Sequence, residues 1–347
     1  MTTWLDEELG EVADALDSGP PAFDLLGRLA AEGLTRVGVP AALGGDGGAP
    51  SDVAAAVAAV ARHSVAAAFV LWSQRSYAEL VVQSDNPALR ARELPALLEG
   101  RWAGGVGLSN AMKFLGGIEP LELAARPDGD RWRVDGVLPW VTNLRAQGFS
   151  VAAAVQPVPG GPLPVVALRS DQPGVRRSPD LPLIGLRGCD VAAVRLQGAL
   201  AGPEDRLHAD LNAWLPQVRP LFLGAQCGMS IGLARASLFA AQKRVGRREA
   251  LRMRLAEAGM GLEVDVAELL QGLDDGRFGA DPAALFRLRL ALALHVQEAL
   301  AQELQAWGGQ AYLEGQAPGF ARRWREAAFI PIITPSVAQL EMQLLKK

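Results

Sequence analysis

The side chains that most often perform catalysis are few in this sequence and lie far apart. His63, His208 and His295 share no spacing that would hold a metal ion, so we expect no metal site. Cys189 and Cys227 form no CxxC pair, which argues against both a zinc site and a disulfide framework. The P-loop and H-E-x-x-H motifs are absent from the sequence, and GMSIG (residues 228–232), which spells G-x-S-x-G, falls in a stretch with helical spacing and not at the strand-to-helix turn of a nucleophile elbow. Local motifs alone therefore indicate no hydrolase, nucleotide-phosphate or metalloprotease chemistry.

One segment near the C-terminus carries hydroxyl groups where a helix is expected to break. Residues 324–344 read WREAAFIPIITPSVAQLEMQL, a helical pattern that is interrupted at PIITP and then resumes. The break contains Thr334 and is followed directly by Ser336, but it contains no side chain that titrates near neutral pH. A hydroxyl serves as a general base there only if another base activates it. The break is therefore expected to line a site without supplying the base.

The elements that would position these residues fall into three zones of different composition. Residues 1–100 are rich in Ala and Leu at helical spacing, residues 101–206 are rich in Val, Trp, Gly and Pro, and residues 207–347 return to helical spacing. In the first zone, Asp24–Leu34 is expected to form a helix. Ser51 is expected to cap a second, long helix after a loop rich in Gly and Pro.

The middle zone has the pattern of a small β unit. RWRVDGVLPWVTN and PVVALRS are short, and Pro and Gly interrupt the zone about every ten residues. Asp135 and Gly136 are predicted to form a tight turn. The glycine-rich stretch GGVGLSN, residues 104–110, lacks the full G-x-G-x-x-G spacing and opens no strand–helix unit, so we expect no Rossmann fold.

The last zone predicts long helices that approach one another closely. Asp281 is expected to cap a helix that Gly308 ends. Glycines recur at every fourth residue, at Gly224, Gly228 and Gly232, and would form one face that allows two helices to come close.

The bulk composition is that of a globular protein. Of its 347 residues, 50% are hydrophobic and 21% are charged, which leaves room for a large core. A net charge of −4 without a long basic run argues against nucleic acid as a partner. The acidic N-terminus does not resemble a signal peptide, and no run of about eighteen apolar residues is free of charge, so we expect no membrane span and a cytoplasmic location.

Five stretches, in the same order along the chain, resemble the acyl-CoA dehydrogenase family of flavoproteins. They are LAAEGLTRVGVPAALGGDGG, DRWRVDGVLPWVTN, LIGLRGCDVAAVRLQGALAGPEDRL, LQAWGGQAYLEG and ARRWREAAFIPIITPS. The resemblance covers nearly the whole chain. It implies an α+β multidomain fold, with an N-terminal all-α domain over residues 1–100, a middle β-barrel or sandwich over residues 101–206, and a C-terminal four-helix bundle over residues 207–347.

The resemblance also implies a site for FAD. Trp140 would lie against the isoalloxazine ring and Thr142 would reach its N5 edge, an arrangement by which a protein can shield and tune a flavin. Ser109 matches the position where the family usually has a threonine at the pyrimidine end of the ring. Gln305 and Gly309 match residues that hold the FAD pyrophosphate of the neighbouring subunit, where glycine permits a close approach to phosphate.

The catalytic glutamate that is usual in the family has no counterpart in this sequence. Its position falls at Thr334, and in relatives that place it on an earlier helix it falls at Val218. Abstraction of an α-proton, coupled to hydride transfer to flavin, needs a base whose contribution is about 10²–10⁴-fold in rate. Glu119 and Glu122 are weak candidates for a replacement, suggested only by their place in the β domain.

The resemblance and the missing base leave three functions open. The first is an FAD-dependent oxidoreductase that oxidises an acyl-CoA or a related substrate with a base not yet recognised. The second is a flavin-dependent monooxygenase of the same fold, which takes reduced flavin from a separate reductase and needs no α-proton base. The third is a non-catalytic paralogue. An electron-transfer partner or a flavin reductase is implied, and so is a homodimer or homotetramer built through the C-terminal helices and their glycine face.

Overall fold

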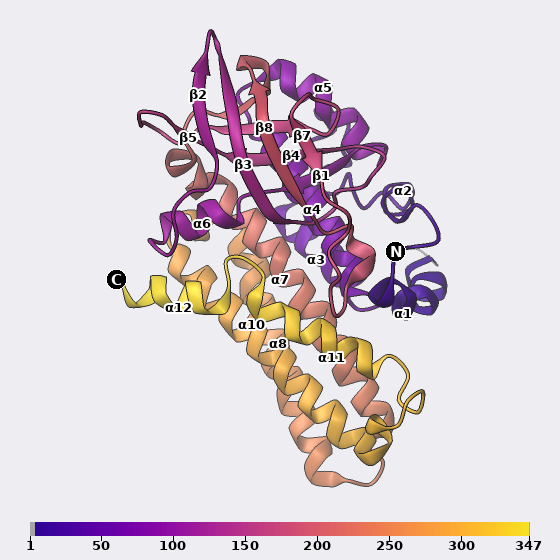
Figure 1. Ribbon diagram of the computed structural model, residues 1–347. Helices are drawn as coiled ribbons and strands as arrows, with labels where there is room; N and C mark the ends of the chain where they lie inside the picture. The colour runs from indigo at the N-terminus through magenta and orange to yellow at the C-terminus, as the bar shows by residue number, and fades with distance from the viewer. Residues whose placement is uncertain (1–3, 347) are drawn as a thin grey trace.

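The computed structural model describes residues 4–346 and has an α+β architecture (Figure 1). Helices come first, two β-sheets lie in the middle of the chain, and long helices form the C-terminal part. This order confirms the fold class expected from the sequence. The domain boundaries at residues 1–100, 101–206 and 207–347 stay a prediction.

The N-terminal part consists of helices packed around one central helix. A π-helical turn, Leu5–Leu9, leads into five α-helices: α1 (Gly10–Ser18), α2 (Leu25–Ala31), α3 (Pro50–Ala61), α4 (Val65–Val82) and α5 (Pro87–Leu98). Almost every side chain of α4 is buried. A helix that is buried on nearly all sides lies in the interior, so α4 is the element against which the later parts of the chain pack.

The predicted start of the second long helix is wrong. Ala49 is the capping residue of α3, and Ser51 instead donates through Oγ and its backbone N–H to the carboxylate of Asp274, at 2.8 and 3.0 Å. The expected single helix is also divided in two, because Ser64 caps α4 by accepting from the N–H of Ala67 at 3.2 Å. Ser51 bonds to Asp274, which lies far along the chain, and a local capping pattern does not predict such a contact.

Two sheets form the middle part. The strands are β1 (Ala103–Val106), β2 (Ala124–Asp128), β3 (Arg131–Val141), β4 (Phe149–Ala154), β5 (Gln156–Pro157), β6 (Val165–Arg169), β7 (Val175–Arg177), β8 (Ala192–Ala201) and β9 (Arg206–His208). One sheet has the order β1-β4-β6-β9 and the other the order β5-β2-β3-β8-β7. The pairs β1–β4 and β2–β5 are parallel and the others are antiparallel. A short helix, α6 (Ser109–Leu115), follows β1 directly.

The tight turn expected at Asp135 and Gly136 is a bulge inside β3. The register against β8 shifts at this point, and Gly136 has a φ of 136°. A Cβ at Gly136 would lie 2.4 Å from the carbonyl oxygen of Glu122, so the strand needs glycine there. The chain reverses instead between β2 and β3, where Gly129 has a φ of 66°.

The C-terminal part is a helical bundle. Its helices are α7 (Leu211–Arg244), α8 (Glu249–Asp274), α9 (Arg277–Ala280), α10 (Pro282–Trp307), α11 (Phe320–Phe329) and α12 (Val337–Leu345). In Figure 1, α7, α8 and α10 extend away from the sheets, and the yellow α11 lies along them. Asp281 accepts from the N–H of Ala284 and Gly308 ends α10 with a φ of 60°, which confirms both predicted boundaries.

Two glycines of α7 bring it into backbone contact with α3. A Cβ at Gly228 would lie 2.5 Å from the carbonyl oxygen of Ala54, and one at Gly232 would lie 2.3 Å from that of Ala58. The predicted close approach of two helices is therefore confirmed, and it occurs within one chain. Gly224 likewise faces a side chain of α8, so the prediction that this glycine face forms a subunit interface is wrong.

One described segment, Phe320–Leu345, has the length and mean hydropathy of a membrane span. It is not one continuous helix, because Pro331 and Pro335 lie within it and a 3₁₀ turn, Ile330–Ile332, separates α11 from α12. Residues 330–336, between these two helices, are called the roof loop below.

Candidate active site

A cavity of about 420 Å³ lies between α4, the β-sheets and the roof loop. This volume falls in the range of roughly 300–1,000 Å³ that is typical of small-molecule sites. We call it the main cavity. Its described lining consists of Phe69, Trp72, Ser73, Val106, Ser109, Lys113, Trp140, Thr142, Leu183, Ile184, Gly185, Leu186, Cys189, Val191, Phe222, Arg325, Ala328, Phe329, Ile332, Ile333 and Thr334. Most of this lining is apolar, with a few polar groups that converge from different segments.

Four residues singled out from the sequence meet in the main cavity. Ser109 begins α6, Trp140 lies near the end of β3, Thr142 follows that strand, and Thr334 belongs to the roof loop. The first and last of these are 225 positions apart, yet the Oγ of Ser109 and the Oγ1 of Thr334 are 2.8 Å apart and form a hydrogen bond. The roof loop thereby contacts the start of α6 across the cavity.

The end of β3 is fixed onto α4 by hydrogen bonds. The Oγ of Ser73 donates to the carbonyl oxygen of Thr142 at 3.3 Å, and the Nδ2 of Asn143 donates to the Oε1 of Gln74 at 2.7 Å. Asn143 has a φ of 61°, a conformation that asparagine tolerates better than most residues. Thr142 is buried as a result, whereas Trp140 is 59% exposed and presents its ring at the mouth of the cavity.

An aromatic cluster forms one wall of the main cavity. The ring centroids of Phe69 and Trp72 are 5.4 Å apart, those of Phe69 and Phe329 are 5.0 Å apart, and those of Trp72 and Phe222 are 4.9 Å apart. The indole N–H of Trp72 donates to the carbonyl oxygen of Phe222 at 3.0 Å. This wall joins α4, α7 and α11, and it excludes water from one side of the cavity.

The titratable groups of the main cavity do not include a base suited to neutral pH. Among its described lining residues there is no Asp, Glu or His. Lys113 lies 3.3 Å from Glu119, and Arg325 pairs with Asp17 at 2.6 Å. Burial raises the pKa of the Cys189 thiol well above its usual range, and the thiol donates to the carbonyl oxygen of Leu186, so it stays protonated.

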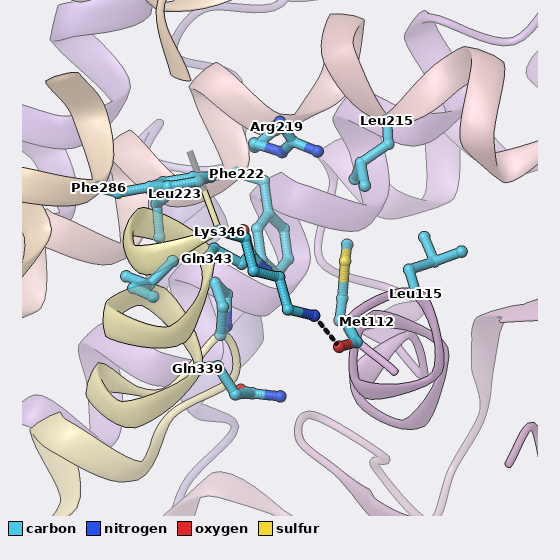
Figure 2. A pocket seen from close by; sticks show the side chains of 13 residues that line it. Met112, Leu115, Leu215, Arg219, Phe222, Leu223, Phe286, Gln339, Gln343 and Lys346 are labelled. Atoms are coloured by element: carbon cyan, nitrogen blue, oxygen red, sulfur yellow. Dashed lines mark hydrogen bonds between the residues drawn. The ribbon is translucent and has the colours of Figure 1, made fainter. Parts of the chain in front are cut away.

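A second cavity, of about 200 Å³, is lined by residues of α6, α7 and α12 (Figure 2). Phe222 lines both cavities, and it projects from α7 toward α6 and α12. Arg219 lies one turn earlier on α7, and no acidic side chain of the described chain pairs with it; its guanidinium is 5.7 Å from the ring of Phe286. Burial lowers the pKa of Arg219. The ammonium of Lys346 donates to the carbonyl oxygen of Gly116 at 2.9 Å and closes the far side.

Comparison with known proteins supports one family. Residues 1–101 match the family model described as acyl-CoA dehydrogenase, N-terminal domain. Over 287 residues the chain is 26% identical to benzylmalonyl-CoA dehydrogenase of Aromatoleum aromaticum. The aligned region covers 74% of this chain and 72% of that protein. The chain is similar to the acyl-CoA dehydrogenase family, most directly in its first 101 residues.

The fold of this chain is similar to that of solved acyl-CoA dehydrogenases along its whole length. The structure of glutaryl-coenzyme A dehydrogenase in complex with glutaryl-CoA matches with a TM-score of 0.85 and 19% identity, covering 99% of this chain and 93% of that one. Butyryl-CoA dehydrogenase from Megasphaera elsdenii matches with a TM-score of 0.84 and 19% identity, covering 99% and 95%. At these identities the likeness concerns the fold.

The two positions that the sequence resemblance matched to the family's base, Thr334 and Val218, are not acidic. Thr334 lines the main cavity. Val218, on α7, is buried in the hydrophobic core and lines neither cavity. Glu119 accepts from the Nδ2 of Asn110 at 2.9 Å in addition to its contact with Lys113. Neither Glu119 nor Glu122 belongs to the lining of the main cavity.

The pair of residues matched to the family's pyrophosphate contacts lies far from the main cavity. Gln305 is at the end of α10, where its Oε1 accepts from Arg254 and its carbonyl oxygen accepts from Arg248, each at 2.8 Å. Gly309 follows in a 3₁₀ turn, and neither residue lines the main cavity. A single chain of this protein therefore brings together four of the six predicted site residues, Ser109, Trp140, Thr142 and Thr334.

Several residues of the two cavities carried no signal in the sequence. Phe222 and Arg219 occur in a helical pattern, where aromatic and basic side chains are common and have no special spacing. Lys113 belongs to the stretch SNAMKFLG, which differs from the sequence motif that is usual in the family at this place. That departure was the one signal that this stretch, now seen as α6, forms a wall between the two cavities.

Proposed function

We propose that this protein is an FAD-dependent oxidoreductase that acts on an acyl thioester. The observation that carries the proposal is the convergence of Ser109, Trp140 and Thr142 on one mostly apolar cavity of about 420 Å³. An aromatic ring at the mouth and hydroxyl groups at the edges fit a flavin ring, which needs apolar faces and hydrogen-bond donors at its heteroatoms. When bound, FAD would supply the hydride acceptor for an oxidation.

The chain's own residues would bind and shield the ring. Trp140 would cover one face, and the hydroxyls of Thr142 and Ser109 would donate to the ring edges. The aromatic wall around Phe69 and Trp72 would keep water from the reacting centre, which strengthens each polar interaction inside the cavity. Thr334 would lie over the site, held by its hydrogen bond to Ser109.

The second cavity favours a substrate with an anionic carrier group such as coenzyme A. Phe222 separates this cavity from the main one, so a thioester passing beside Phe222 could extend from one into the other. The guanidinium of Arg219, which has no acidic partner in the described chain, suits a phosphate or a carbonyl of the carrier. The names of two similar proteins, benzylmalonyl-CoA dehydrogenase and glutaryl-coenzyme A dehydrogenase, support the same substrate class.

Replacing Arg219 with methionine should weaken the binding of coenzyme A. Methionine keeps the apolar stem of the side chain but lacks the guanidinium, so the loss reports mainly the charged hydrogen bond, which is worth about tenfold in affinity. Isothermal titration with free coenzyme A measures this without turnover. Arg287→Met, at an exposed arginine of α10 that lines neither cavity, is the matched control. Equal affinities in the two variants would contradict the role of Arg219.

A second function, an oxygen-using flavin monooxygenase of the same fold, is favoured by one observation. No Asp, Glu or His occurs in the described lining of the main cavity, so the site lacks a general base for an α-proton. A monooxygenase that receives reduced flavin from a separate reductase needs no such base. The hydroxyls of Ser109 and Thr334 would then orient the substrate.

Flavin binding by the purified protein distinguishes these functions. Tightly bound oxidised FAD that bleaches anaerobically with an acyl-CoA supports the dehydrogenase. Weak binding of oxidised flavin, together with tighter binding of reduced flavin, supports the monooxygenase. A protein that binds neither form is a non-catalytic paralogue, and that result would contradict the proposal.

We infer that the protein is a homodimer or a homotetramer. Gln305 and Gly309 lie away from the main cavity of their own chain, so they could serve the FAD of a neighbouring subunit only in an assembly. Exposed apolar side chains on α8 and α10, among them Met260, Val264 and Leu294, offer surface for such contacts. We expect light scattering at micromolar concentration to give at least a dimer; a monomer would contradict the inference and remove the proposed role of these two residues.

The cellular setting belongs to the same proposal. An acyl-CoA oxidation that reduces FAD needs an acceptor, so an electron-transfer partner is expected, and the alternative function needs a flavin reductase. A cytoplasmic location is consistent with two free cysteines that are both buried.

A further inference from the structure

A buried arginine of α10 reaches the roof loop. Arg289 is 1% exposed, and its Nη2 donates to the carbonyl oxygen of Ile330, the first residue of the loop, at 2.6 Å. Its Nε donates to the Oε1 of Gln226 on α7 at 3.0 Å. No carboxylate of the described chain pairs with this guanidinium, and its Nη1 has no partner there.

Gln226 transmits this contact to Thr334. Its side chain is 1% exposed, and its Nε2 donates to the carbonyl oxygen of Thr334 at 3.0 Å. The orientation of the amide is fixed, because the side of Gln226 that faces Arg289 must be the accepting oxygen, since a guanidinium only donates. The N–H₂ group therefore faces the loop. The three residues form a directed chain, Arg289 to Gln226 to Thr334.

The two contacts hold the loop at both ends of its apolar stretch. Ile330 and Thr334 are the residues whose carbonyl oxygens are bonded, and Ile332, between them, is 66% exposed. The only other side chain outside the loop that bonds to Thr334 in the described chain is Ser109, through its hydroxyl. The backbone of Thr334 is thus fixed from the bundle, while its hydroxyl is left to face the main cavity.

A purely structural role accounts poorly for this arrangement. Burial without a carboxylate partner lowers the pKa of Arg289 and costs free energy that an apolar side chain of similar volume would not. Leu223 of α7 and Leu285 and Leu292 of α10 belong to the buried hydrophobic core of the same bundle. The retention of a charged side chain there is explained if the loop must be held in one position.

We propose that Arg289 and Gln226 are positioning residues that fix Thr334 against Ser109 over the main cavity. The inference rests on the proposed function, since it assigns the loop to a flavin and substrate site. The two residues act through the backbone of the loop and need not touch the substrate. Loosening them lets the roof loop move away from Ser109 and opens the cavity to water.

Gln226→Glu separates positioning from stability. The carboxylate keeps the shape of the glutamine, stays ionised beside Arg289, and accepts a stronger, charge-assisted hydrogen bond from it. It offers no hydrogen to the carbonyl oxygen of Thr334. The melting temperature should therefore be unchanged or higher than that of the wild type, while the contact to the loop is lost.

Hydrogen exchange followed by mass spectrometry measures directly how well the amides of the roof loop are protected. The amides of Ile332, Ile333 and Thr334 should exchange about fivefold to tenfold faster in Gln226→Glu, the ratio expected for one lost hydrogen bond. The FAD dissociation constant should rise in parallel. Ser230→Ala, which removes a buried hydroxyl one turn along α7 that has no partner in the described chain, is the control and should leave the loop unchanged.

This experiment tests the positioning role and the proposed FAD-dependent function separately. Unchanged exchange of the roof loop in Gln226→Glu would overturn the positioning role, whatever the flavin result. A lower melting temperature with faster exchange throughout α7 and α10 would make Gln226 a structural residue and overturn it as well. A wild-type protein that binds no FAD would contradict the proposed function, and the exchange of the loop would still decide whether Gln226 and Arg289 hold Thr334.

Discussion

Replacing Trp140 with alanine should weaken FAD binding by about 5- to 150-fold, which corresponds to the roughly 1–3 kcal/mol that stacking of an aromatic side chain on a planar ring contributes. Trp140 is 59% exposed at the mouth of the main cavity, so its ring makes few contacts that the fold requires. The substitution should therefore leave the melting temperature nearly unchanged. The loss falls on the ligand, because the indole face is what would cover the isoalloxazine.

Titration of the apoprotein with FAD, followed by the quenching of flavin fluorescence, measures this change. Trp140→Phe should recover most of the affinity, because it restores an aromatic face at the same place. Trp324→Ala is the matched control, since Trp324 is also half-exposed, at 50%, but lies on α11 outside both cavities. An affinity for FAD that does not change in Trp140→Ala would show that the ring binds elsewhere.

The sequence predicted the fold well where local rules decide the structure and poorly where distant contacts do. The boundaries of α10 at Asp281 and Gly308 follow from capping chemistry within a few residues, and both were found. Ser51 looked like an equally good cap, but the carboxylate of Asp274 on α8 takes its hydrogen bonds. Gly136 has the residue type of a turn, yet a neighbouring carbonyl makes it a bulge.

The glycine face of α7 shows how one correct inference can support a wrong one. Spacing by four predicted that Gly228 and Gly232 would let helices approach closely, and the carbonyl oxygens of α3 do lie where a Cβ would be. Periodicity cannot say which helix approaches, because every helix of the chain or of a second copy is a candidate. The partner is α3 of the same chain, so this face is not free for another subunit.

The site was predictable mainly through resemblance. Ser109, Thr142 and Thr334 are ordinary hydroxyl residues, and nothing in their types or spacing indicates that they meet in one cavity. The family stretches that contain Thr142 and Thr334, and the match of Ser109 to a family threonine, did indicate it. Gln226 and Arg289 belong to no such stretch, and their contact with the roof loop depends on how α7 and α10 face each other in the folded bundle.

Restoring a carboxylate to the roof loop should raise the oxidation of acyl-CoA by about 10²–10⁴-fold, the usual contribution of a positioned general base. The variant is Thr334→Glu combined with Pro335→Gly. Proline fixes its own φ and restricts the residue before it, so the single change Thr334→Glu could point the carboxylate away from the cavity. Thr334 lines the main cavity, which gives a longer side chain at this position a direct path toward the site.

The pH dependence of the rate of the double variant tests independently whether the new glutamate acts as the base. An apolar cavity disfavours the charged form of a carboxyl group, so the pKa of the new glutamate should lie above its ordinary value. Only the ionised form accepts a proton, and the rate should therefore rise as the pH increases through that raised pKa. The wild-type protein has no acidic group in the described lining of the cavity and should lack this limb of the profile.

Thr334→Ala provides the decisive comparison. It removes the hydroxyl that contacts Ser109 but no base, so any oxidation of acyl-CoA that the wild-type protein performs should change little. Anaerobic bleaching of bound FAD with a panel of acyl-CoA thioesters measures all of these proteins under the same conditions. If the wild type already bleaches rapidly and Thr334→Ala abolishes the reaction, Thr334 takes part in proton transfer, and the conclusion that this loop lacks the base is wrong.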